Sequence, residues 1–163
     1  MVQTSSLPLS TRQDGSPLQI NDVWIDTNTC NIKKWTGTQW IERAIVLAKF
    51  SANATVGINA NMPFNSKVTD TTNSYNASTY EFTAPYTGAY MISMQNNTTG
   101  ANVAGSPALH VNNVFVQDGW FGGTTCGFTI TLQLTRNDIV TVRQSVGANT
   151  YLATTSQYSI VHL

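Results

Sequence analysis

The side chains that could support catalysis are few and lie far apart in the sequence. His110 and His162 are the only histidines, and the chain has neither a Gly-x-Ser-x-Gly nucleophile motif nor a His-Glu-x-x-His zinc motif. The eight acidic residues are scattered, so no carboxylate pair can be selected for glycoside hydrolysis. Asp118 follows His110 across a predicted hairpin, but lone histidines of this kind are more often structural than catalytic. We therefore expect both histidines to be structural and the protein not to be an enzyme.

Cys30 and Cys126 are the only cysteines, and they stand far apart, outside any Cys-x-x-Cys pair. A zinc site or a disulfide framework needs more ligands at closer spacing. Small buried thiols are the simpler interpretation of both residues. The sequence thus predicts no catalytic residue, no metal site and no cofactor.

The composition argues against several kinds of partner. The 163 residues include eight basic and eight acidic side chains, so the net charge is zero. Nucleic-acid binding needs clustered Lys and Arg, and Lys33-Lys34 is the one basic doublet. The chain has no run of about 18 apolar residues, so we expect no membrane insertion. The first residues lack the basic start and apolar run of a signal peptide, which favours synthesis in a cytosol.

The strongest structural signal is the stretch Tyr80-Glu-Phe-Thr-Ala-Pro-Tyr-Thr-Gly-Ala-Tyr90. Pro85 fixes φ and lacks a backbone donor, and Gly88 tolerates a tight turn, so both belong at a break between strands. Phe82 and Tyr90 stand on either side of this break, and alternation puts both on the core face. We interpret the stretch as a corner between two packed sheets. An ordinary aromatic loop is the alternative.

The rest of the chain from Phe50 onwards also has an all-β pattern. Thr and Asn, which favour strands and turns, make up about a quarter of the residues. Asn112-Asn113 predicts a hairpin because Asn tolerates positive φ. Many short strands without helices favour a two-sheet sandwich or a barrel. The strand candidates are 62–68, 79–83, 89–95, 107–111, 114–117, 127–134, 139–145 and 156–162.

Two further segments precede this domain, which we expect to span residues 46–163. Residues 1–20 contain two prolines and little periodicity, so we expect an extended or disordered segment that orders only against a partner. This segment is either an attachment arm or a plain flexible end. Residues 21–45 fit three short strands near 23–26, 32–35 and 39–42. The core of this small meander would be formed by Trp24, Trp35 and Trp40.

Both folded parts resemble known proteins. Trp24-Ile-Asp-Thr27, followed by Trp35-Thr-Gly-Thr-Gln-Trp40, resembles a small β-meander found in bacteriophage tail-fibre and other virion proteins, although Asn21 stands where that pattern has Gly. The main domain resembles the trimeric jelly roll of tumour-necrosis-factor (TNF) ligands and of the globular head of complement's first component. Its corner, residues 80–90, matches the Phe-x-Ala-Pro-x-x-Gly-x-Tyr signature of that group.

The jelly-roll resemblance implies a two-sheet sandwich that assembles as a homotrimer. It also implies that the last strand lies near the three-fold axis. Two positions depart from the pattern of the group, since Asn137 stands for the Gly of a Gly-Asp turn and Ile160 for the Gly of the last strand. The calcium sites of the group do not carry over, because no acidic cluster stands at matching positions. The implied interface residues are Tyr90, Tyr158, Ile160 and His162.

These features favour one class of function over two others. Enzymatic activity lacks a motif, and the signalling ligands of the jelly-roll group are usually secreted or membrane-anchored. We expect a bacteriophage structural protein, made in the host cytoplasm and located in the virion. It would be a trimeric capsid decoration (cement) or head-fibre protein that binds the major capsid protein or another virion protein through residues 1–45. The alternative is a tail-fibre tip that recognises a glycan or receptor on the host surface.

Overall fold

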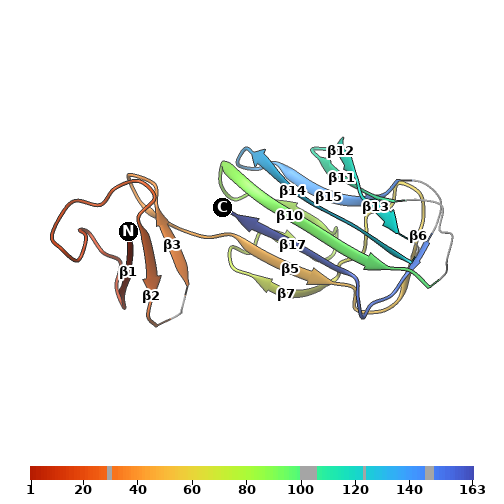
Figure 1. Ribbon diagram of the computed structural model, residues 1–163, viewed down its shortest axis with the longest axis horizontal. Coiled ribbons are helices and arrows are strands. Elements are labelled where there is room, and N and C mark those ends of the chain that lie inside the picture. Colours follow the sequence, from red (N-terminus) through yellow and green to blue (C-terminus); the bar gives the residue numbers. More distant parts are fainter. Residues whose placement is uncertain (29–30, 100–105, 123, 146–148) are drawn as a thin grey trace. The chain divides into compact units, whose positions relative to one another are not determined.

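The computed structural model describes the chain except residues 29–30, 100–105, 123 and 146–148. The described part contains seventeen strands and no helix, which confirms the predicted all-β class. The chain divides into two compact units, Met1–Arg43 and Ala44–Leu163 (Figure 1).

The N-terminal unit is one small sheet made of β1 (Val2–Ser5), β2 (Val23–Asp26), β3 (Ile32–Trp35) and β4 (Trp40–Glu42). β2, β3 and β4 form the antiparallel meander that the sequence predicted. β1 joins this meander in parallel, with Gln3 opposite Trp24. Residues 1–20 are therefore not the separate arm that we expected from the sequence, because their first strand pairs with the chain's own β2.

The second unit contains a six-stranded sheet. Its strands are β5 (Ile45–Lys49), β7 (Ser66–Asp70), β10 (Gly88–Asn97), β13 (Trp120–Gly122), β14 (Thr125–Leu134) and β17 (Gln157–His162). They lie in the order β13-β14-β10-β17-β5-β7, and every neighbouring pair is antiparallel. The last strand of the chain thus lies in the middle of the sheet, between β10 and β5.

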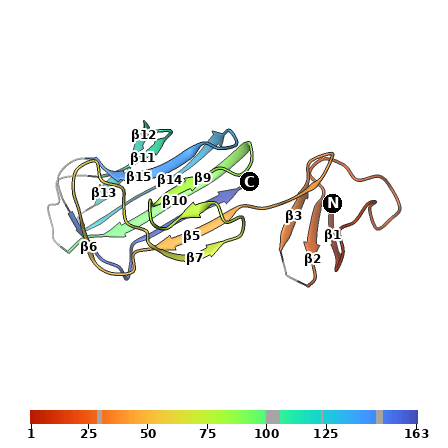
Figure 2. The same ribbon diagram turned by 180° about the vertical axis from the view of Figure 1, so that it is seen from behind.

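A five-stranded sheet stacks on the six-stranded one (Figure 1, Figure 2). It contains β8 (Tyr75–Asn76), β9 (Glu81–Thr83), β11 (Pro107–Val111), β12 (Val114–Asp118) and β15 (Ile139–Gln144), in the order β12-β11-β15-β9-β8. A separate pair joins β6 (Ala54–Val56) to β16 (Asn149–Tyr151). The apolar side chains of the two large sheets meet between them and form one core.

The predicted corner connects the two sheets. It links β9 of the five-stranded sheet to β10 of the six-stranded sheet, and Pro85 lies in the connection. The rings of Phe82 and Tyr90 meet edge to face inside the sandwich, with centroids 5.7 Å apart. At Gly88 the chain runs so close to His162 that a Cβ would collide with the imidazole ring. Close backbone approach is therefore the physical reason for glycine at this position.

The strands that the sequence missed are short. β6, β13 and β16 have three residues each and β8 has two, which is too few for alternation to be recognised. The predicted hairpin is present between β11 and β12. Its two turn residues, Asn112 and Asn113, have φ values of 51° and 67°, as a tight hairpin turn with the favoured twist requires.

Candidate functional site

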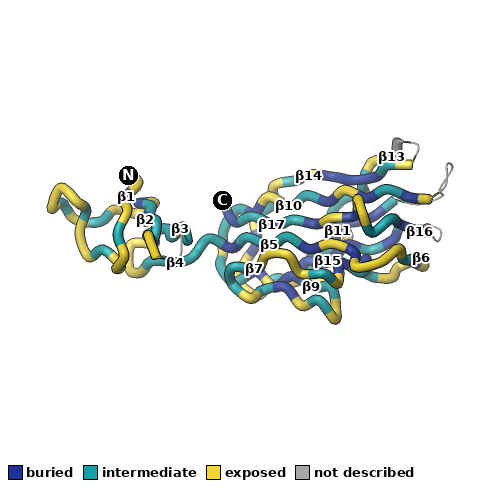
Figure 3. The backbone as a smooth tube through the Cα atoms, turned by 90° about the horizontal axis from the view of Figure 1, so that it is seen from below, coloured by how far each residue is buried: buried dark blue, intermediate teal, exposed yellow. Residues whose placement is uncertain are grey.

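The six-stranded sheet has two faces, and this decides which residues a second molecule can touch. Its inner face packs on the five-stranded sheet, and its outer face points away from it. Figure 3 shows buried positions alternating with partly or fully exposed ones along β10 and β17. The four predicted interface residues, Tyr90, Tyr158, Ile160 and His162, are at most 6% exposed within the single chain. Side chains with almost no accessible surface offer little contact area to a second copy, so we look for a self-association surface on the opposite face of these strands, and the four residues remain an untested interface prediction.

The rings around the end of β17 have a structural role. The ring centroid of His162 lies 4.7 Å from that of Tyr90 and 5.7 Å from that of Tyr86. The Tyr90 hydroxyl donates to the Tyr86 carbonyl oxygen at 2.8 Å and accepts from the Tyr86 N–H at 3.3 Å. Burial raises the pKa of Tyr90 to about 12, so this hydroxyl stays protonated and remains a donor. These contacts fix the corner after β9 from inside the sandwich.

Tyr158 and Ile160 lie further along the inner face of β17. The Tyr158 ring stacks on Phe64 with centroids 5.3 Å apart, and burial raises the pKa of its hydroxyl. Ile160 has no exposed surface and lies in register between Ile92 of β10 and Val46 of β5. Both residues therefore belong to the core of the jelly roll.

The outer face carries a row of apolar side chains across three neighbouring strands. Met91 of β10 pairs with Val161 of β17, which pairs with Ile45 of β5. Leu47 lies on the same face of β5. Met91 is 39% exposed, and the other three side chains are partly exposed. We call these four residues the apolar row; such a row on an open sheet face is typical of a surface that another chain covers.

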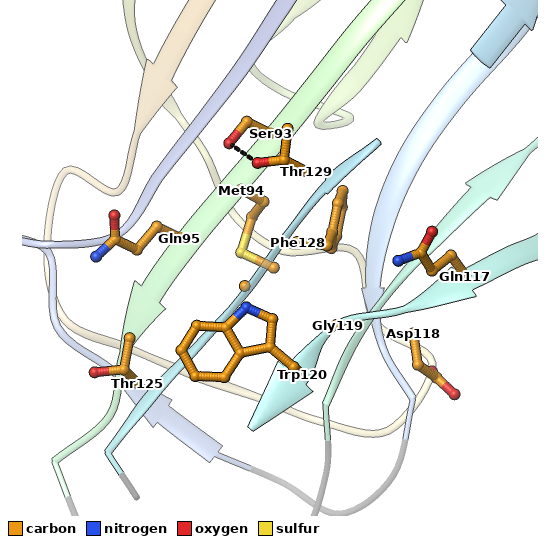
Figure 4. Close-up of a pocket in the computed structure, with 11 residues that line it drawn as sticks. Ser93, Met94, Gln95, Gln117, Asp118, Gly119, Trp120, Thr125, Phe128 and Thr129 are labelled. Carbon is orange, nitrogen blue, oxygen red and sulfur yellow. Dashed lines mark hydrogen bonds between the residues drawn. The ribbon is translucent and has the colours of Figure 1, made fainter. Parts of the chain in front are cut away.

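The other half of the outer face contains a groove beside the edge strand β13. In register, Trp120 of β13 lies opposite Gly127 of β14, which lies opposite Gln95 of β10. The groove has a volume of about 700 Å³ (Figure 4). Its lining residues are Ser93, Met94, Gln95, Gln117, Asp118, Gly119, Trp120, Thr125, Gly127, Phe128 and Thr129. We call it the Trp120 groove.

Sequence reasoning did not identify Trp120. It is the one tryptophan outside the N-terminal unit, and it stands between Gly119 and Phe121-Gly-Gly123. A lone tryptophan among glycines was the only sequence signal, and it does not tell a core residue from a surface residue. The structure leaves the Trp120 side chain 61% exposed.

In the N-terminal unit the three predicted core tryptophans lie together. The ring centroid of Trp40 is 5.9 Å from that of Trp24 and 5.4 Å from that of Trp35. The indole N–H of Trp24 donates to the carbonyl oxygen of Ser5, and that of Trp40 donates to the carbonyl oxygen of Leu9. Two of the three tryptophans thus hold the N-terminal segment against the meander.

A buried carboxylate adds to this attachment. Asp22 is 1% exposed and accepts two hydrogen bonds from the Arg12 guanidinium, at 2.8 and 2.9 Å. It also accepts from the Gln19 N–H at 2.9 Å and from the amino group of Met1 at 3.0 Å. The Arg12 hydrogen bond, followed by the Gln19 N–H, holds the pKa of Asp22 well below its ordinary value. Asp22 therefore joins three parts of the N-terminal segment through its charged form.

The metal-ligating side chains of the described residues do not cluster. These residues contain no group of three or more His, Cys, Asp or Glu side chains arranged to hold a metal ion. Cys126 is buried and free, and burial raises the pKa of its thiol to about 12, whereas Cys30 lies outside the described residues. The ring of His110 packs against Phe115 with centroids 6.0 Å apart.

No helix that could span a membrane is present in the described part of the chain.

Comparison with known proteins identifies the fold of the chain. No sequence family and no curated protein matches it. Its structure is similar to that of Eiger TNF from S. frugiperda, with a TM-score of 0.59 and 16% identity over 74% of this chain and 91% of that one. The globular domain of zebrafish complement 1qA protein matches with a TM-score of 0.55 and 14% identity over 72% of this chain and 93% of that one. Murine APRIL matches with a TM-score of 0.59 and 12% identity over 74% of this chain and 99% of that one. At such identities the similarity establishes the jelly-roll fold and nothing further.

Proposed function

We propose that this protein is a non-enzymatic, homotrimeric structural protein of a bacteriophage virion. The N-terminal unit binds the major capsid protein or another virion protein, and the jelly roll is displayed as a capsid decoration (cement) protein or head fibre. The observation that supports this proposal is the combination of a separately folded, Trp-rich meander with a TNF-like jelly roll. The link to virion proteins rests on the sequence resemblance of that meander, at residues 24–27 and 35–40, to theirs. The chain is then made in the host cytoplasm and located in the virion.

The apolar row supports self-association through the outer face. In a cyclic trimer each copy offers a surface to its neighbour, and that surface must be apolar enough to be stable when buried. The central pairs of the row, Met91 with Val161 and Val161 with Ile45, contain no charged side chain. Burial of this row therefore requires no desolvation of a charge.

The N-terminal unit has features that support binding to another virion protein. Val2, Leu7 and Ile20 are 63%, 72% and 66% exposed, which is unusually high for large apolar side chains. β1 is also the edge strand of its sheet, and among its backbone groups the Thr4 carbonyl oxygen already accepts from the Gln13 side chain at 2.9 Å. The whole unit, rather than a free arm, is the attachment element in this proposal.

A matched pair of variants tests the trimer. Met91→Asp places a carboxylate in the apolar row, and Val114→Asp places one on the β11–β12 hairpin of the other sheet, where Val114 is 67% exposed. Because burial of an unpaired charge costs several kcal/mol, the first variant should be monomeric and the second trimeric. Light scattering coupled to size-exclusion chromatography gives the mass of each. A monomeric wild type would refute the homotrimer, and a trimeric Met91→Asp would exclude the apolar row as its interface.

The placement in the virion is tested with gold-labelled antibody on intact particles, viewed by electron microscopy. Label distributed over the head supports decoration, and particles carrying the chain without its first 43 residues should lose that label. Label confined to the tail would exclude the decoration role. Absence of label from head and tail would refute the virion assignment as a whole.

A tail-fibre tip that recognises the host surface is the second candidate, and the Trp120 groove favours it. A wide groove with an exposed aromatic side chain has no obvious use in a shell-stabilising protein. It suits a protein whose jelly roll contacts a ligand outside the particle.

A further inference from the structure

The exposure of Trp120 is the starting observation. A tryptophan is usually buried for most of its surface, because its indole is the largest apolar side chain. Here the indole is 61% exposed on the edge strand β13, although the sandwich core is close by. The three other tryptophans pack against one another in the N-terminal unit. Trp120 therefore presents a flat apolar surface to solvent, at the rim of a groove rather than on a convex part of the molecule.

Polar side chains with free hydrogen-bonding capacity surround this surface. Among the described residues, the side chains of Gln95, Gln117 and Asp118 make no hydrogen bond or ion pair with another protein group. Figure 4 shows Gln95 on one side of the indole and Gln117 and Asp118 on the other, with the hydrogen-bonded pair of Ser93 and Thr129 further along the groove. Amides both donate and accept, and a carboxylate accepts. Together they can satisfy a ligand that carries several hydroxyl groups at short spacing.

The floor of the groove leaves room for a ring-sized ligand. Gly127 lies in register between Trp120 and Gln95, so no side chain rises from the sheet between the indole and the amide. Met94 and Phe128 also line the groove. A volume of about 700 Å³ exceeds that of a single sugar ring and suits one or two of them.

The charges of the groove restrict the class of ligand. Asp118 is the one charged side chain among the described lining residues, and they include no Lys, Arg or His. A phosphate, a sulfate or a carboxylated sugar would find no cation here and would be repelled by Asp118. Nucleic acid is disfavoured for the same reason. A neutral, polyhydroxylated ligand meets no such repulsion.

We propose that the Trp120 groove binds a neutral pyranose of a surface glycan. The apolar face of the sugar ring stacks on the Trp120 indole, whose electron-rich face attracts the polarised C–H groups. Asp118 accepts hydrogen bonds from neighbouring hydroxyl groups, while Gln95 and Gln117 donate and accept at either side. This inference rests on the second candidate function, in which the jelly roll contacts the host surface. It names the site and the ligand class for that contact.

The groove and the trimer contact use different parts of the same sheet face. The apolar row lies where β5 and β10 begin and β17 ends, whereas the groove lies towards the end of β10 and the start of β14. Met91 and Gln95 occupy the same face of β10, four residues apart. Loss of one surface therefore need not disturb the other, and the two proposals can be tested separately.

A glycan array probed with the full-length protein tests the proposal directly. The array carries oligosaccharides ending in glucose, galactose, mannose and N-acetylglucosamine, with sialylated and sulfated counterparts. We expect binding to neutral glycans and reduced binding to the anionic counterparts. Trp120→Ala should weaken binding to the best neutral glycan at least tenfold, about 1.4 kcal/mol, as expected for loss of an aromatic stacking contact. Asp118→Asn, which keeps the shape of the side chain, should weaken binding to a lesser degree.

Phe115→Ala provides the matched control. Phe115 is a second exposed aromatic residue, 54% exposed on β12 of the other sheet, and its replacement should leave glycan binding unchanged. Circular dichroism and the measured mass show whether each variant is folded and has the wild-type assembly state. Absence of glycan binding by the folded wild type would overturn the proposal, as would unchanged binding by Trp120→Ala or a preference for anionic glycans. A trimeric protein without glycan binding would overturn this inference alone, whereas a monomeric protein with glycan binding would overturn the trimer alone.

Discussion

Ile160 and Val161 are adjacent on β17, and their side chains lie on opposite faces of the six-stranded sheet. Ile160 is fully buried between the sheets, whereas Val161 is partly exposed in the apolar row. Replacement of each by alanine therefore separates the two faces in one experiment. We expect Ile160→Ala to lower the free energy of unfolding strongly, and Val161→Ala to affect it little.

The magnitude follows from burial. Truncation of a fully buried isoleucine to alanine costs about 2–5 kcal/mol, because apolar contacts are lost and a cavity remains. The position between Ile92 and Val46, in the centre of the sheet, favours a value of about 3 kcal/mol, since neighbouring strands restrict relaxation. With a urea dependence of about 2 kcal/mol per M, the unfolding midpoint should fall by about 1.5 M. Val161→Ala should lower the urea concentration at the unfolding midpoint by about 0.25 M or less, as expected for a surface substitution.

The assay must follow the jelly roll rather than the N-terminal unit. Three of the four tryptophans lie in residues 1–43, so their fluorescence reports mainly on that unit. Hydrogen exchange measured by mass spectrometry on peptides covering β10 and β17 follows the correct part of the chain. Both alanine replacements are made in the Met91→Asp variant, which we expect to be monomeric, because in the trimer the neighbouring copy would cover Val161 and association would stabilise the folded state by mass action.

Two results would refute the assignment of faces. The first is an equal loss of stability for both variants, which would mean that both side chains are buried. The second is a stable Ile160→Ala together with a strongly destabilised Val161→Ala, which would reverse the faces and support Ile160 as an interface residue.

Two further predictions concern the corner and the N-terminal unit. Gly88→Val should leave the protein insoluble, because its side chain would overlap His162, and recovery of soluble, folded protein would contradict the packing at the corner. Gly57→Val, where a Cβ meets no atom and φ is not positive, is the control for added bulk. The pKa of Asp22 is lower in the folded state than in the unfolded state. Its charge therefore stabilises the N-terminal unit at pH values above the unfolded pKa of about 4. This stabilisation is lost as the pH falls towards the folded-state pKa. Tryptophan fluorescence measured at falling pH should therefore show this unit unfolding partly below about pH 4. The transition should be weaker in an Asp22→Asn variant, which is already destabilised at neutral pH. An identical transition in that variant would mean that another group titrates.

The class of fold and many local features could be predicted from the sequence alone. Strands β11 and β14 could be located from alternation and composition, because the period of two is a local property of the chain. The Asn112-Asn113 hairpin and the Pro85–Gly88 corner were equally accessible, since turns depend on the backbone preferences of a few residues. The corner motif, together with other motifs that resemble those of TNF ligands and the complement head, also led to the jelly-roll prediction, which the structural similarity confirms.

Which face of each strand is buried, and which segments meet, became known from the folded chain. β17 carries apolar side chains on both faces, Ile160 on one and Val161 on the other, so its pattern alone could not show which face meets the second sheet. The pairing of β1 with β2 joins segments separated by about twenty residues. The burial of Trp24 and Asp22, which stabilises this pairing, exists only once the unit has folded. The Trp120 groove likewise depends on four strands, β10, β12, β13 and β14, that come together only in the folded domain. Contacts between distant segments are set by the packing of the whole core, and no local pattern in the sequence records them.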